Sequence, residues 1–152
     1  AGEEHNLAVT ADGAVWSWGN GRWGRLGHGD EQSQPLPKKI EALAGQRVLA
    51  VSAGSDHSLA ITVDGAVCSW GYGASGMLGH GDQQNQPLPK KVEAFTGQRV
   101  VAVSAGSVHS LARTADGALF TWGKGGDGCL GHGDDLSNQL LPKRIEAWAP
   151  GK

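Results

Sequence analysis

The chain has 152 residues, enough for one ordinary domain, and a formal net charge of -2 at pH 7. This balance excludes a strong overall field toward nucleic acid or a membrane surface. Glycine occurs 25 times and proline 6 times, a composition that favours many tight turns between short strands. No apolar run approaches the roughly 20 residues of a membrane-spanning helix, and no signal-peptide pattern precedes the first repeat, so we expect no membrane association.

The two cysteines, Cys68 and Cys129, fall at non-equivalent points of the repeat described next. A disulfide framework or a zinc site would recur with that repeat. Free thiols in a reducing compartment are therefore the preferred interpretation, and they predict an intracellular protein, either cytoplasmic or nuclear.

A period of 52 residues runs through the chain. Ala-Gly, a histidine, a tryptophan and the run GHGD each recur at this spacing, and the third repeat gains one residue before Pro142. Self-similarity of this kind indicates a repeat architecture. We divide the chain into three repeats, each expected to correspond to one structural unit: residues 1–52, 53–104 and 105–152.

Each repeat carries the pattern of four short strands, seen most clearly at 48–52, 57–62, 66–71 and 90–95. Asp64-Gly65 separates the second from the third, a strong indication of a tight hairpin turn. No segment has helical periodicity. Four antiparallel strands per repeat of about 50 residues predict an all-β fold of β-propeller blades.

Most repeated residues are explained by folding. Trp18 and its equivalents Trp70 and Trp122 are expected to pack between stacked sheets. His5, His57 and His109 are expected to hydrogen bond to the backbone of a neighbouring blade rather than to bind metal. His28 and its copies are interpreted as turn organisers. No catalytic constellation recurs, so we expect neither an enzyme nor a cofactor or metal.

Two further motifs have simple structural explanations. The glycines at 19, 21 and 24 fit a phosphate-loop pattern by letter, but no helix opens after them to supply an anion-binding N-terminus. The basic pairs at 38–39, 90–91 and 143–144 are expected on the outer edge strand, where lysine and proline oppose aggregation. A glutamate follows each pair, so we do not expect nucleic-acid binding.

The first two repeats differ mainly in two loops, one before the second strand and one between the third and fourth strands. Because strands alternate in direction, both loops should open on the same face of the blade. A varied loop face on a constant frame is typical of a surface that binds protein partners, and neutral drift is the alternative. Trp23 is expected to be exposed there, with hot-spot composition around it. The candidate contact residues are Glu3, Glu4, Arg22, Trp23, Arg25, Asp56, Tyr72, Met77, Lys124 and Asp127.

The pattern AG-x-x-H-x-L-A-x-T-x-D-G-x-V-x-x-W-G, followed by LGHGD and P-x-x-I/V, resembles the regulator of chromosome condensation repeat in all three repeats. The resemblance implies a seven-bladed propeller. It also implies kinship with an exchange factor for a small nuclear GTPase, with the plant ultraviolet-B receptor and with propellers of large ubiquitin ligases. These members make a protein-interaction scaffold the leading hypothesis and guanine-nucleotide exchange the alternative.

Two of these implied functions are disfavoured by particular positions. In the receptor, which this chain resembles, light-sensing tryptophans stand at the positions that Glu3, Ser55 and Ser107 occupy here. The tryptophan cluster is therefore missing. The exchange factor carries a β-wedge between blades, whereas the first two repeats here join without an insertion.

Three blades do not close a ring, because propellers have four to eight. Two interpretations follow: a fragment of a seven-bladed protein, or two copies that associate into a six-bladed ring. Arg113 replaces Val9 and Ile61 of the other repeats. An arginine on a packed strand is costly unless it is paired, so it is expected to mark a boundary blade or a contact with a missing neighbour.

Overall fold

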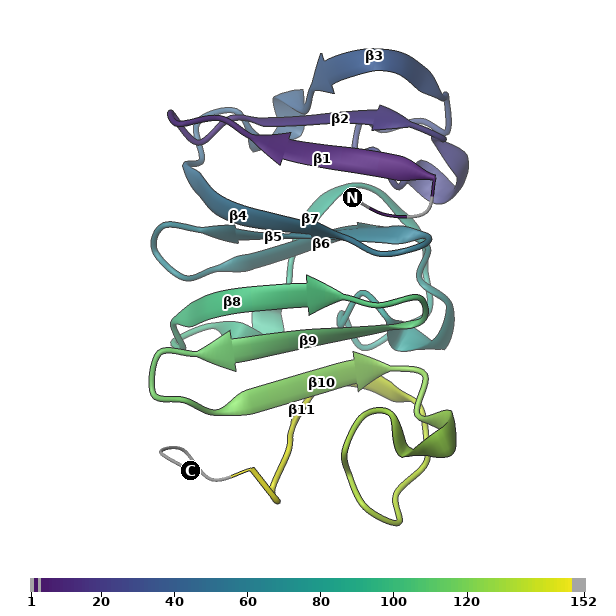
Figure 1. Ribbon diagram of the computed structural model, residues 1–152, viewed down its shortest axis with the longest axis vertical. Coiled ribbons are helices and arrows are strands. Elements are labelled where there is room, and N and C mark those ends of the chain that lie inside the picture. The colour runs from purple at the N-terminus through teal and green to yellow at the C-terminus, as the bar shows by residue number, and fades with distance from the viewer. Residues whose placement is uncertain (1, 3, 149–152) are drawn as a thin grey trace.

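The computed structural model describes residue 2 and residues 4–148, which form three antiparallel sheets stacked along the long axis of the molecule (Figure 1). The first sheet contains β1 (His5–Val9), β2 (Val15–Gly19) and β3 (Gln34–Lys39). The second contains β4 (Val48–Ala53), β5 (His57–Thr62), β6 (Val67–Gly71) and β7 (Gln86–Lys91). The third contains β8 (Val100–Ala105), β9 (His109–Thr114), β10 (Leu119–Gly123) and β11 (Gln139–Arg144).

The all-β propeller-blade architecture is confirmed. The sheets, here called blades 1 to 3, are offset from the sequence period because β4, at the end of the first repeat, pairs with β5 of the second. Blades 2 and 3 therefore have four strands. Blade 1 has three in the part of the chain that the structure describes.

The hairpin turns form as the Asp-Gly pairs predict. In blade 2, Thr62 Oγ1 donates to Asp64 Oδ1, and Gly65 adopts a positive φ of 91°. A side chain at Gly65 would also collide with Arg99 of the next link between blades. The aspartate thus closes the turn, and the glycine lets the following link pass close by.

The fourth strand differs from the expected 90–95. It begins at Gln86, so it includes Pro87 and Pro89, and residues 93–95 form a short 3-10 turn, η4 (Glu93–Phe95). Proline is tolerated because β7 is an edge strand that pairs only with β6, and the register slips between Ser69 and Gly71. The basic pairs do lie on these edge strands, as predicted. The equivalent turn in blade 1 is η2 (Glu41–Leu43).

The core lies between blades rather than within them. Each blade has an upstream face toward the preceding blade and a downstream face toward the following one. Trp70 on the upstream face of blade 2 and Trp122 on that of blade 3 are completely buried, as predicted. Trp18, on the upstream face of blade 1, is only half-buried, because no described element covers that face.

Candidate partner-binding face

The two variable loops of each blade lie side by side. The backbone N–H of Asn20 donates to the Glu4 carbonyl at 2.8 Å, and that of Tyr72 donates to the Asp56 carbonyl at 2.9 Å. Lys124 N donates in the same way to Val108 O at 3.0 Å. These bonds hold the loop before the second strand against the start of the long loop that follows the third. We call the surface formed by residues 4, 20–33, 54–56, 72–85, 107–108 and 124–138 the loop face.

Each long loop starts with a 3-10 turn: η1 (Arg22–Gly24), η3 (Ala74–Gly76) and η5 (Gly126–Gly128). The central residue has a left-handed backbone in every blade, with φ of 66° at Trp23, 61° at Ser75 and 62° at Asp127. Side chains other than glycine rarely adopt this conformation. The loops thus hold three different side chains at one strained backbone position.

Carboxylate and amide oxygens stabilise two of these turns. Glu31 Oε1 accepts the Trp23 N–H at 2.9 Å, and Gln83 Oε1 accepts the Ser75 N–H at 3.0 Å. The sequence interpretation did not include Glu31 among the candidate residues. The sequence did contain a signal for it, because Gln83 stands 52 residues later at the equivalent position. Both side chains carry an Oε1 atom that can accept a hydrogen bond.

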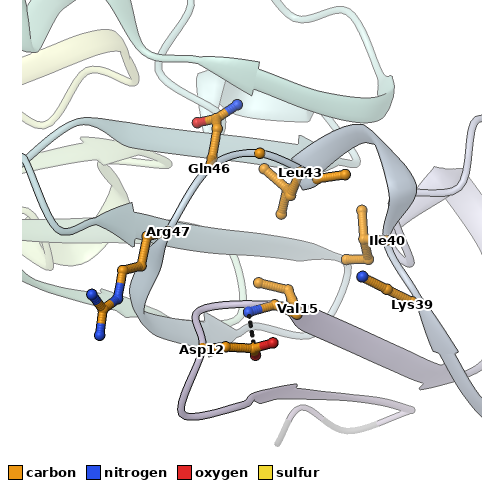
Figure 2. A pocket seen from close by; sticks show the side chains of 10 residues that line it. Asp12, Val15, Lys39, Ile40, Leu43, Gln46 and Arg47 are labelled. Atoms are coloured by element: carbon orange, nitrogen blue, oxygen red, sulfur yellow. Dashed lines mark hydrogen bonds between the residues drawn. The ribbon is translucent and has the colours of Figure 1, made fainter.

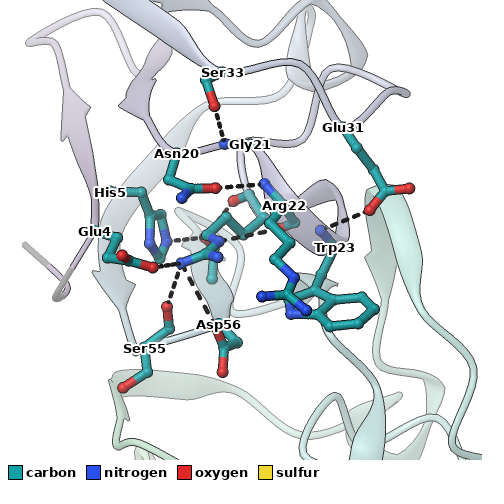
Figure 3. Close-up of polar contacts among 12 residues, drawn as sticks. Glu4, His5, Asn20, Gly21, Arg22, Trp23, Glu31, Ser33, Ser55 and Asp56 are labelled. Atoms are coloured by element: carbon teal, nitrogen blue, oxygen red, sulfur yellow. Dashed lines mark hydrogen bonds and ion pairs between the residues drawn. The ribbon is translucent and has the colours of Figure 1, made fainter.

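Trp23 stacks on Tyr72 of the next blade, with ring centroids 4.5 Å apart and an angle of 26° between planes. The Arg22 guanidinium carbon lies 4.5 Å from the centroid of the Trp23 ring (Figure 3). This contact leaves Trp23 half-buried, so the tryptophan is less exposed than the sequence predicted. The three side chains form one continuous platform across the junction of blades 1 and 2.

Arg25 is buried, with 1 % of its surface exposed, which contradicts its predicted accessibility on a binding surface. Its Nη1 donates to the carbonyl oxygen of Ser55 at 2.8 Å and lies 3.4 Å from Glu4 Oε2 and 3.5 Å from Asp56 Oδ1 (Figure 3). Its Nε donates to Arg22 O at 3.0 Å. Arg25 therefore connects two blades instead of facing a partner.

The other candidate residues differ in how far they are exposed to solvent. Met77, the counterpart of Arg25, is also buried, so its predicted accessibility was wrong as well. Glu4, Lys124 and Asp127 are exposed, and Asp56 is half-buried. Glu3 lies outside the described residues. The structure thus brings Arg22, Trp23, Tyr72, Glu4 and Asp56 together at one junction, and Lys124 and Asp127 lie in the equivalent loop of blade 3.

The first histidine series connects neighbouring blades, but through a side chain and not the backbone as expected. His5 Nε2 lies 2.9 Å from Ser58 Oγ, and His57 Nε2 lies 2.9 Å from Ser110 Oγ. Since the Ser58 hydroxyl donates to a carbonyl, the histidine must donate to the serine oxygen. Burial, the main cause, lowers the pKa of His5 to about 4 and that of His57 to about 3, so both rings are neutral at pH 7.

The second histidine series organises the loops, as predicted. His28 Nε2 lies 2.9 Å from Ser17 Oγ, and His80 Nε2 lies 2.8 Å from Ser69 Oγ. Burial lowers the pKa of both histidines. Each ring therefore ties the GHGD run of the loop to the central strand of its own blade.

On the opposite side of the blades, a hollow of about 300 Å³ lies between the hairpin turn of blade 1 and the link that leads into blade 2 (Figure 2). Asp12, Lys39, Leu43 and Arg47 contribute to its wall. An equivalent hollow of about 120 Å³ lies at the next junction, where Phe95 replaces Leu43. Because this hollow recurs between equivalent residues of the repeat, it is a feature of blade packing.

No cluster of three or more histidine, cysteine, aspartate or glutamate side chains suited to a metal ion occurs among the described residues. Within the same residues, no helix is long and apolar enough to cross a membrane.

Comparison with known proteins identifies the repeat. The family model for the regulator of chromosome condensation (RCC1) repeat matches residues 12–61, 64–113 and 116–149. The chain is 47% identical over 148 residues to the E3 ubiquitin-protein ligase HERC2 of Homo sapiens, covering 96% of this chain and 3% of HERC2. It is 41% identical over 146 residues to the ultraviolet-B receptor UVR8 of Arabidopsis thaliana, covering 96% of this chain and 33% of the receptor.

Among solved structures, Prp20p of Saccharomyces cerevisiae superimposes with a TM-score of 0.85 at 28% identity, covering 96% of this chain and 37% of Prp20p. Prp20p is described as a protein that binds Gsp1p and histones. The chain thus spans 3% of the ligase and about a third of the ultraviolet-B receptor. With three family repeats along its length and blades that superimpose on Prp20p, the chain belongs to the RCC1 repeat family.

Proposed function

We propose that this chain is a protein-interaction segment of an RCC1-type propeller and that it binds its partner through the loop face. The observation that supports this is the platform of Arg22, Trp23 and Tyr72 at the junction of blades 1 and 2. Tryptophan, tyrosine and arginine dominate the binding energy of protein interfaces. Here they lie in loops that backbone and side-chain hydrogen bonds hold in place at the ends of the strands, so little conformational entropy is lost on binding.

The electrostatics of the platform favour a specific protein contact. Among the described residues, Arg22 forms no ion pair, while Glu4 and Asp56 nearby share the buried charge of Arg25. The Arg22 guanidinium is exposed, and its contact with the Trp23 ring orients it. Such a group suits a carboxylate beside an apolar side chain on the partner.

The test is affinity capture from a eukaryotic cell extract with three immobilised proteins. One is the unchanged chain, and one is Arg22→Ala/Trp23→Gly/Tyr72→Ala. Glycine is used at Trp23 because φ is 66° there, so removal of the ring adds no backbone strain. The matched control is Leu36→Ala/Leu88→Ala on the outer edge strands. Proteins captured by the unchanged chain and the control should be lost on the triple variant. If they remain, the platform is not the contact surface.

Guanine-nucleotide exchange on a small GTPase is the second candidate function. It is favoured by the TM-score of 0.85 with Prp20p, whose binding to Gsp1p is described. Release of a fluorescent guanine nucleotide from a panel of small GTPases tests it. Acceleration by the chain over buffer would support exchange, and no acceleration with any GTPase would remove it.

A further inference from the structure

With one exception, the chain places glycine wherever its backbone has a positive φ. Among the described residues, 17 glycines have a positive φ, and only three other residues share it: Trp23, Ser75 and Asp127. Each of the three is the middle residue of the 3-10 turn that opens a long loop. The exception therefore belongs to one position of the repeat, which carries a different side chain in every blade.

The hydrogen bonds of the fold do not require a side chain at this position. Gln83 holds the backbone N–H of Ser75, a group that glycine would supply equally well. Among the described residues, the Ser75 hydroxyl takes part in no hydrogen bond, and the Asp127 carboxylate forms neither a hydrogen bond nor an ion pair. Only Trp23 gains a contact that offsets its strain, by stacking on Tyr72.

Backbone strain that the surrounding fold does not repay is typical of functional positions. Glycine would relieve this strain at Ser75 and Asp127, yet the chain keeps a hydroxyl at one and a carboxylate at the other. The long loops that follow β2, β6 and β10 lie on one side of the stack (Figure 1). The position thus presents an aromatic ring, a hydroxyl and a carboxylate in successive blades of the loop face.

We infer that Ser75 and Asp127 contact the same partner as the platform of Arg22, Trp23 and Tyr72, an inference that rests on the proposed function. The contact then extends over all three blades. A carboxylate only accepts hydrogen bonds, so the partner presents a lysine or arginine to Asp127. The Ser75 hydroxyl can both donate and accept, and it reads a polar group between the two ends. The partner surface is therefore acidic and apolar at blade 1 and basic at blade 3.

The test starts from the extract proteins that the unchanged chain captures and the Arg22→Ala/Trp23→Gly/Tyr72→Ala variant does not, here called the platform set. Ser75→Gly/Asp127→Gly removes two side chains together with their strain, so its thermal midpoint should not fall. It should nevertheless capture the platform set at least about fivefold less well.

The matched control is Glu41→Ala/Gln46→Ala. It makes the same change of net charge in the link on the opposite side of the blades, where both residues are exposed. Surface substitutions of this kind change free energies little, so capture of the platform set should stay within about twofold of the unchanged chain.

Asp127→Asn isolates the charge, because asparagine also tolerates a positive φ. If the facing group is a lysine or arginine, this variant should capture the platform set about fivefold less well at low salt. The difference from the unchanged chain should shrink at about 0.5 M sodium chloride, since salt screens exposed charges. Full capture by Asp127→Asn at low salt would contradict a basic group at blade 3.

The outcomes separate this inference from the proposed function. Undiminished capture of the platform set by Ser75→Gly/Asp127→Gly would overturn the inference and leave the proposed function standing, because the platform variant defines the set. A lowered thermal midpoint of that glycine variant would also overturn it, since the fold itself would then need the two side chains. An empty platform set would instead remove the proposed function, and this inference with it.

Discussion

Arg25 of blade 1 donates from Nη1 to the backbone carbonyl of Ser55, 2.8 Å away in the link that leads into blade 2. The guanidinium is buried, whereas the side chains of its acidic partners Glu4 and Asp56 are 59% and 35% exposed. Removal of the arginine leaves the Ser55 carbonyl without this donor, while both carboxylates regain water. We expect Arg25→Ala to lower the free energy of unfolding by about 2 kcal/mol.

Arg25→Met is the matched comparison, because Met77 fills the same position in blade 2. It restores the packing but not the charge, so we expect a smaller loss of about 1 kcal/mol. Urea unfolding of both variants and of Arg22→Ala, an exposed neighbour, measures the differences. Equal effects of all three substitutions would contradict a stabilising role specific to Arg25.

The buried histidines predict a loss of stability in mild acid. Burial lowers the pKa of His5 from 6.5 to about 4 and that of His57 from 6.5 to about 3, so between these values and 6.5 the unfolded chain binds more protons than the folded chain. Stability is therefore full above pH 6.5 and falls as the pH drops, by about 1.4 kcal/mol per pH unit for each such histidine.

His57→Gln keeps a hydrogen-bond donor near Ser110 but does not titrate. Its urea midpoints between pH 6.5 and 4.5 should fall less steeply than those of the unchanged chain, by roughly the contribution of one proton. If the two slopes are the same, His57 is not kept neutral by the fold.

Ser75 has a φ of 61°, a conformation that costs an ordinary side chain about 1–2 kcal/mol. Ser75→Gly removes this strain and keeps the backbone bond to Gln83. The gain is partly offset by the greater freedom of glycine in the unfolded chain, so we expect a net stabilisation of about 0.5 kcal/mol. A rise in the thermal midpoint checks this, and Ser55→Gly, at a position without positive φ, should not raise it.

The hollow beside Leu43 is larger than the equivalent hollow beside Phe95. It measures about 300 Å³, against about 120 Å³ at the next junction, where Phe95 occupies the position. We expect Leu43→Phe to stabilise the chain by about 1 kcal/mol through added apolar burial. Phe95→Leu should destabilise it by a similar amount or more. Thermal unfolding measures both, and a destabilising Leu43→Phe would show that Cys68 leaves no space for the ring.

The two thiols should react differently. Cys129 is exposed, whereas Cys68 is buried and burial raises the pKa of its thiol. Since the thiolate is the reactive form, one thiol per chain should react with a disulfide reagent in the native protein and two in urea. Cys129→Ser should abolish the native reaction. Two reactive thiols in the folded state would mean that the sheet opens at Cys68.

The sequence alone determined the architecture, because each strand and turn depends on local chemistry repeated three times. Asp64-Gly65 specifies its turn wherever the blade lies, and the 52-residue period requires one unit to recur. The edge position of the basic pairs followed from the neighbouring prolines. Proline has no backbone N–H to donate, so it is confined to edge strands. The error over the fourth strand arose because an edge strand tolerates proline where a central strand does not.

Only the tertiary structure decided which side chains the loops expose. Arg22 and Arg25 are three residues apart and chemically alike, yet one lies on a tryptophan at the surface and the other is buried between blades. That difference depends on Ser55 and Asp56, about 30 residues later, which the sheets bring to Arg25. The serine partners of the histidines were missed for the same reason, since contacts between blades join residues that share no local pattern. A repeat thus predicts its own blade, whereas the residues at each junction depend on how two blades pack.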